Sequence, residues 1–171
     1  MIAGVIKFVL SNFTLTFIGI WLLFSAGVIF TGPKPYSLKS VTGTLLSYYL
    51  LFNIGIGNIY NFICHVFFAE MSAAFIGWAD SPFQLEVGFA SLGFGVVGLL
   101  AFRAGPGFRA AAVTGPALFL WGAAGGHVFQ MIKARNFAPG NAGVVFWTDI
   151  FLPVIGFLLL YLQRRTEKIQ V

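Results

Sequence analysis

The sequence contains very little charge. Of its 171 residues, 9% are Asp, Glu, Lys or Arg, whereas 58% are hydrophobic. A water-soluble domain needs a charged surface of mixed sign, so this composition excludes an ordinary soluble domain. The few charges fall in short breaks between long apolar runs, and the mean hydropathy is +0.90. We therefore expect an integral membrane protein.

Other absences narrow the function further. Cys64 is the single cysteine, which excludes an internal disulfide. The sequence has no phosphate-binding loop, no Gly-x-Ser-x-Gly nucleophile motif and no His-Glu-x-x-His zinc motif. The net charge of +5 comes from bases scattered at the ends of apolar runs, with no basic face, so no nucleic-acid partner is expected.

Five apolar segments are long enough to cross a bilayer, since about 20 residues are needed for a helical span. Helices are expected because lipid offers the backbone no hydrogen-bond partners, and the runs are too long for barrel strands. The first segment is too long for a signal peptide and is expected to be retained. The links are short, so residues 1–171 form one all-α transmembrane domain. The predicted spans are about 4–30, 41–68, 82–102, 108–132 and 142–162.

The basic residues predict an orientation. With five spans, seven bases fall on one side and three on the other, and the richer side is expected to be cytoplasmic. This places the N-terminus outside and the C-terminus in the cytoplasm. The richer side carries Lys34, Lys39, Arg103, Arg109, Arg164, Arg165 and Lys168. The poorer side carries Lys7, Lys133 and Arg135.

Polar residues inside the spans form a candidate site. Such residues are costly in hydrocarbon and usually face a bundle interior. Counting 1.5 Å of rise per residue, this topology brings polar side chains from four spans to a similar depth in the outer leaflet, with Glu70 closer to the membrane surface. The predicted polar cluster consists of Asn58, Asn61, His65, Glu70, Glu86, His127, Gln130 and Asp149.

Four interpretations of the two histidines remain open. His65 and His127 could ligate one haem b iron from both sides. They could instead form a transition-metal site with Glu86. A proton or solute relay is the third interpretation, because His and carboxylates exchange protons near neutral pH. The fourth is a buried hydrogen-bond network that fixes the register of the helices.

Three local patterns carry structural predictions. Ser81, Pro82 and Gln84 predict a capped helix start, with Gln84 reaching back as the partner in a capping box. The glycines at 93, 95 and 98 predict close helix packing within a span, as does the Gly122/Gly126 pair. Pro153 lacks an N–H, so the carbonyl of Asp149 loses its helical partner and the helix is expected to kink or to bind a water or cation there.

Two strings are specific enough to suggest relatives. Ser-Pro-Phe-Gln-x-Glu occupies 81–86 and Asn-Phe-Ala-Pro-Gly-Asn-Ala-Gly occupies 136–143, and both lie on the predicted outer face. Together with Asn61, His65 and Asp149 they resemble a family of small prokaryotic multi-pass membrane proteins of unknown function. The resemblance covers about two thirds of the chain and implies a multi-pass fold in a prokaryotic inner membrane, with no activity attached.

Three functions are compatible with these features. The first is a non-enzymatic accessory subunit or homo-oligomer in the lipid bilayer, whose outer face packs against a larger membrane complex or a second copy. The second is a haem- or metal-binding protein of electron transfer or oxidation. The third is a small proton-linked transporter or channel.

Overall fold

A computed structural model describes residue 8 and residues 11–168, and these are helical apart from short connections, with no strand among them. The start of the first predicted span, near Gly4, lies outside the described residues. The elements in chain order are α2 (Phe13–Thr31), α3 (Leu38–Tyr49), the π-helix η1 (Leu50–Ile56), α4 (Gly57–Phe67), α5 (Ala69–Ile76), α6 (Phe83–Ala101), α7 (Pro106–Ala134), α8 (Pro139–Ala142) and α9 (Val144–Lys168).

Within the described residues, four helices are long and apolar enough to cross a membrane: Phe13–Thr31, Leu38–Phe67, Phe83–Ala101 and Pro139–Thr166. They match the first, second, third and fifth predicted spans. The fourth prediction, 108–132, falls in α7, whose 29 residues extend about 43 Å at 1.5 Å per residue. This helix is long enough but is not among the four, because small and polar residues lower its hydropathy. Five spans are therefore not confirmed.

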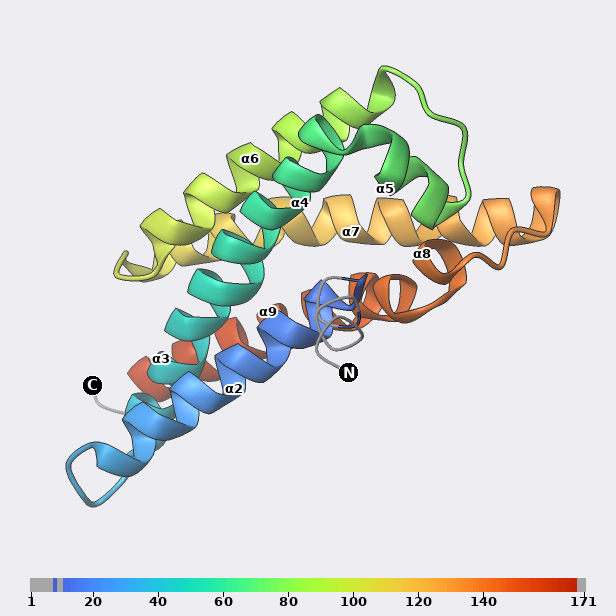
Figure 1. Ribbon diagram of the computed structural model, residues 1–171. Coiled ribbons are helices and arrows are strands. Elements are labelled where there is room, and N and C mark those ends of the chain that lie inside the picture. Colours follow the sequence, from blue (N-terminus) through green and yellow to red (C-terminus); the bar gives the residue numbers. More distant parts are fainter. Residues whose placement is uncertain (1–7, 9–10, 169–171) are drawn as a thin grey trace.

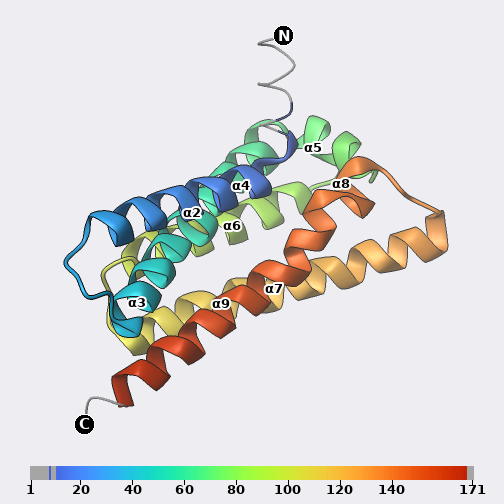
Figure 2. The ribbon, with the colours of Figure 1, turned by 90° about the horizontal axis from the view of Figure 1, so that it is seen from below.

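The helices pack mainly in pairs. Helix α4 lies along α6, α7 along α9, and α3 contacts both α2 and α9. Figures 1 and 2 show the α2–α3 loop, the α6–α7 loop and the end of α9 at one end of the molecule, with the α5–α6 and α7–α8 connections at the other. The core includes the fully buried Leu46, Leu50 and Val113. The Tyr49 hydroxyl donates to the Leu152 carbonyl at 2.8 Å and ties α3 to α9.

Close backbone approach joins α6 to η1. A Cβ added at Gly98 would lie 2.5 Å from the Gly55 nitrogen, and one at Gly95 would lie 3.0 Å from the Gly55 carbonyl oxygen. Neither position could carry a side chain without separating the helices. The prediction of close packing is confirmed at these two glycines, whereas Gly93 faces open space.

The end of the molecule that carries α5 is built by a sharp turn after that helix. Gly77 ends α5 with φ +75°, a left-handed conformation that favours glycine. A side chain at Gly77 would also collide with the Asn136 amide, whose oxygen would be 2.8 Å from the added Cβ. The turn therefore requires glycine for two reasons, and it brings the residues after Gly77 next to the α7–α8 connection.

Candidate functional site

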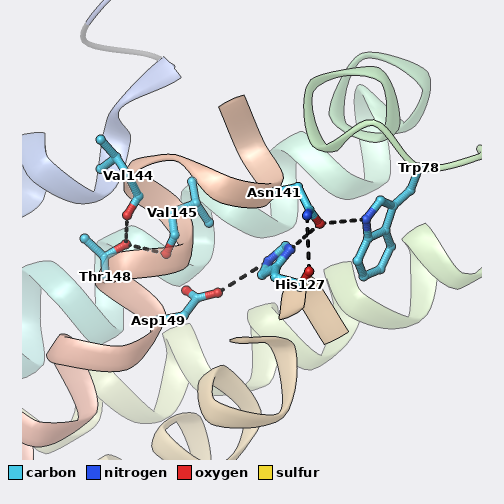
Figure 3. A network of polar contacts seen from close by, with 7 residues as sticks. All are labelled: Trp78, His127, Asn141, Val144, Val145, Thr148 and Asp149. Carbon is cyan, nitrogen blue, oxygen red and sulfur yellow. Dashed lines mark hydrogen bonds and ion pairs between the residues drawn. The ribbon is translucent and has the colours of Figure 1, made fainter. Parts of the chain in front are cut away.

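A buried polar network centred on Asn141 joins α7, α8, α9 and the turn after α5 (Figure 3). The Asn141 side chain is completely buried. Its Oδ1 atom accepts from Trp78 Nε1 at 3.0 Å and lies 2.8 Å from His127 Nδ1. Its Nδ2 atom donates to the carbonyls of His127 at 3.2 Å and Asn136 at 2.9 Å. One amide thus fastens the turn after α5, which is 63 residues away in the sequence, to α7 and to the connection that follows α7.

The network determines which nitrogen of His127 carries a proton. An indole N–H can only donate, so the Asn141 atom facing Trp78 must be the oxygen. The same oxygen faces His127 Nδ1, which must therefore also donate. In a neutral imidazole with hydrogen on Nδ1, Nε2 is an unprotonated acceptor.

That unprotonated nitrogen faces a carboxylate. His127 Nε2 lies 3.6 Å from Asp149 Oδ2, and both side chains are 7% exposed. Two acceptors facing each other in a buried place repel, and an isolated charge there is costly. One shared proton removes the conflict, either as imidazolium and carboxylate or as neutral imidazole and carboxylic acid. The pair is therefore built to hold at least one proton.

The Asn-rich connection after α7 positions this network. Asn136 Nδ2 donates to the carbonyls of Ile76 at 2.9 Å and Gly77 at 3.1 Å, while its Oδ1 accepts from the Ala138 N–H at 3.0 Å. These contacts fasten the connection to the end of α5. The four-residue helix α8 then turns Asn141 inward. Thr148 takes no part, because its hydroxyl donates back to the carbonyls of Val144 and Val145 (Figure 3).

A second polar network lies between α4 and α6. His65 Nδ1 lies 2.5 Å from Gln84 Oε1, and both side chains are buried. One helical turn or so below them, Asn61 Nδ2 donates to Ser91 Oγ at 2.9 Å, and Ser91 donates to the Val87 carbonyl at 2.8 Å. These bonds link the two helices pairwise and involve no acid.

The predicted capping box at the start of α6 is wrong. Gln84 extends toward His65 instead of back along its own chain, and no side chain caps the helix. The backbone of Gln84 donates to the Ser81 carbonyl at 3.0 Å, which satisfies that N–H without a capping side chain. A buried imidazole offers Gln84 a partner away from water, and this interaction outweighs a cap on an exposed turn.

The predicted polar cluster divides into separate groups. His127 meets Asp149, whereas His65 and Asn61 belong to the α4–α6 network. Asn58 donates to the carbonyl of Ile54 in its own helical segment at 2.9 Å. The remaining predicted members stay outside both networks: Glu70 and Glu86 are exposed, and Gln130 is half-buried.

The two histidines therefore face different partners. Among residue 8 and residues 11–168, no group of three or more His, Cys, Asp and Glu side chains is placed to hold a metal ion. The structure does not bring His65, His127 and Glu86 together as a metal site. Both imidazoles use Nδ1 for an amide oxygen, which leaves Nε2 as the nitrogen that could bind an iron, and His127 Nε2 faces the Asp149 carboxylate.

A small cavity lies one helical turn from Asp149. It measures about 20 Å³, and its lining includes Asn53, Asn58, Leu152 and Pro153. Asn53 is 9% exposed, and neither its Nδ2 nor its Oδ1 has a hydrogen-bond partner among the described residues. A space of this size holds one water, which would satisfy an amide that is otherwise costly to bury. Asn53 lies on η1, and π-helical turns often occur at functional sites.

The sequence profile of one protein family, described as a family of unknown function (DUF6790), matches residues 11–169. The chain belongs to the DUF6790 family. No curated protein and no solved structure matches the chain. The match to residues 11–169 covers more of the chain than the two thirds that carried the resemblance noted from the sequence. Both polar networks lie within the matched residues.

In this DUF6790 chain, five residues of the networks were missed as site residues by sequence reasoning. One of them, Ser91 on α6, was given no role. Asn136 and Asn141 lie in the Asn-Phe-Ala-Pro-Gly-Asn-Ala-Gly string, where they were interpreted as part of an outer loop. Gln84 was interpreted as a cap and Trp78 as a membrane-surface anchor. The usable signal was the specificity of the two strings, which contain Gln84, Asn136 and Asn141.

Proposed function

We propose that the protein is a small proton-linked transporter or channel in which the His127–Asp149 pair carries the proton. The observation that supports this is the buried His127 Nε2 facing a buried Asp149 carboxyl oxygen 3.6 Å away, an arrangement that is stable only if the two groups share a proton. An intramembrane acid beside an acceptor nitrogen is the arrangement of proton relays. The pair can hold one proton or two, so it can accept a proton from one side and release it later.

The cavity beside Asn53 offers a place for a water that could exchange a proton with the His127–Asp149 pair. Asp149 and Pro153 are four residues apart, or about 6 Å along the helix axis. Pro153 cannot donate to the carbonyl of Asp149, which leaves an acceptor near the cavity. A water held by the Asn53 amide would then lie within one turn of the proton-holding pair. Leu46 and Leu50, both fully buried, belong with Tyr49 to the hydrophobic core of the bundle.

Proton flux in liposomes tests the proposal. The purified protein is reconstituted with a pH-sensitive dye inside, and a potassium diffusion potential drives protons inward. We expect the wild-type protein to acidify the lumen faster than protein-free liposomes, and Asp149→Asn to lower the flux at least tenfold. Glu86→Gln is the matched control, since it removes an exposed carboxylate from a neighbouring helix and should retain the flux.

Two results would contradict the proposal. One is a wild-type flux equal to that of empty liposomes. The other is equal flux for Asp149→Asn and wild type, with both proteins shown to be folded by their elution volume and helical circular dichroism. Loss of flux in Glu86→Gln alone would also contradict it, because that side chain lies outside the buried pair.

We further propose the orientation in which the N-terminus is outside and the C-terminus is cytoplasmic, with α7 as a fifth crossing in a prokaryotic inner membrane. The distribution of charge supports it. Arg103, Arg109, Arg164 and Arg165 lie at the end of the molecule where α9 finishes, and Lys133 lies at the opposite end of α7. Cysteine labelling of each terminus in intact cells tests this topology.

A second candidate function is that of an accessory subunit or homo-oligomer. The low hydropathy of α7 and its exposed glycines support it. This long helix is not among the four apolar spans, and Gly122 and Gly125 on it face open space. Small residues allow another helix to approach closely, and such contact would shield α7 from lipid. Native mass spectrometry in neutral detergent should then find two or more copies or a stable partner, and a single chain would contradict this role.

A further inference from the structure

An open pocket lies at the other end of the molecule, between α3 and the α6–α7 connection. Its volume is about 500 Å³, within the usual range for small-molecule sites. The lining combines hydroxyl groups with two guanidinium groups, and none of these described residues is acidic. It consists of Ser40, Gly43, Thr44, Ser47, Tyr48, Phe102, Arg103 and Arg109.

Arg109 is built into the wall of this pocket. The residue is 8% exposed. Its Nε donates to the Ala101 carbonyl at 3.2 Å, and its Nη2 donates to the Phe102 carbonyl at 2.6 Å and to Ser47 Oγ at 2.7 Å. These contacts hold the guanidinium rigidly across the end of α6. Because these contacts use the Nε and Nη2 hydrogens, Arg109 contributes a fixed positive charge to the wall of the pocket.

Arg103 supplies the accessible charge. It is exposed on the α6–α7 connection and lies against the Phe102 ring, 5.7 Å from its centroid. Ser40, Thr44 and Ser47 lie on α3 at spacings of three and four, so they share one face of that helix. Gly43 has no neighbouring heavy atoms within 4 Å of an added Cβ, which leaves the wall open there.

We propose that this pocket binds a phosphate group, the chemistry shared by an anionic phospholipid headgroup and a free phosphate ion. The exposed Arg103 guanidinium can match phosphate oxygens with paired hydrogen bonds, Arg109 adds a fixed positive charge, and hydroxyl groups complete the donor set. Lipid headgroups lie at the ends of a transmembrane bundle, and this pocket lies at such an end. Basic pockets between transmembrane helices on the cytoplasmic side bind such headgroups. The site is separate from the His127–Asp149 pair and does not depend on the proposed proton transport.

Binding to the full-length protein in neutral detergent tests this site. The probes are short-chain phosphatidylglycerol, short-chain phosphatidylcholine and inorganic phosphate, titrated while the intrinsic fluorescence and the melting temperature are recorded. Arg103→Gln should weaken binding of the anionic probe about tenfold, as expected for one charge-assisted contact. Arg164→Gln is the matched control, since it removes an exposed charge from the same end of the molecule and should change affinity less than threefold. Arg109 is left intact because its backbone contacts support the fold.

Each outcome decides the question. Saturable phosphatidylglycerol binding that depends on Arg103, is weaker for phosphatidylcholine and is not displaced by inorganic phosphate supports the site with a lipid headgroup as its ligand. Displacement by inorganic phosphate at similar concentration supports the site with free phosphate as its ligand. Absence of saturable binding by either anion, or equal losses in Arg103→Gln and Arg164→Gln, overturns the proposal.

Discussion

Replacement of Asn141 by alanine should destabilise the fold more than any other single amide truncation in the chain. The side chain is fully buried and makes four hydrogen bonds to Trp78, His127 and Asn136. Hydrogen bonds between membrane helices contribute about 0.6 to 2 kcal/mol each, and a buried donor left without a partner costs about 1 to 3 kcal/mol. Since the bonds act as a unit, we expect a loss of about 2 to 4 kcal/mol.

Unfolding by sodium dodecyl sulfate in mixed micelles measures this loss, with helical circular dichroism and tryptophan fluorescence as readouts. Asn12→Ala is the matched control, because that amide bonds only to Phe8 and Ser11 within its own turn and should cost less than about 0.5 kcal/mol. Equal midpoints for the two variants would refute the reasoning, since the network would then contribute nothing beyond one local amide.

Two further predictions concern η1 and its neighbour. Gly98→Ala should destabilise by about 1 to 3 kcal/mol in the same unfolding assay, because its Cβ would lie 2.5 Å from the Gly55 nitrogen, whereas Gly93→Ala faces open space and should be neutral or slightly stabilising. Asn53→Leu should leave the unfolding midpoint unchanged or raised, because its amide has no protein partner, while lowering proton flux in liposomes. A lowered midpoint with unchanged flux would assign Asn53 a structural role only.

The spans were predictable because their cause is local. Long apolar runs bounded by Gly and Pro predict helices wherever lipid removes other hydrogen-bond partners, and four of the five runs form helices that are long and apolar enough to cross a membrane. The end of the second run near Phe68 was expected, whereas the short helix α5 after it and the π-helical turn at Leu50–Ile56 were not foreseen. They follow from packing against other helices, as the approach of Gly55 to Gly98 illustrates, and packing leaves little trace in a single apolar run.

The site was predicted less well than the spans, for a physical reason. Depth in the membrane follows from counting residues, so His127 and Asp149 were expected at one level and do meet. Direction around the helix axis depends on how neighbouring helices cross, and depth alone could not separate buried His65 from exposed Glu86. Asn141 was missed because it was assigned to a loop, although α8 buries it completely.

The two histidines together supply an argument about Asp149. His65 and His127 are both buried, and each has an amide oxygen against Nδ1, from Gln84 and Asn141 respectively. A neutral amide is therefore sufficient to hold a buried imidazole in this protein. His127 has a carboxylate in addition, in a buried place where a charge is costly and an amide would cost less. A purely structural role does not require that acid. If Asp149→Asn retains the unfolding midpoint while proton flux is lost, the carboxylate serves the proton; if the midpoint falls and flux per folded protein is kept, it serves the fold.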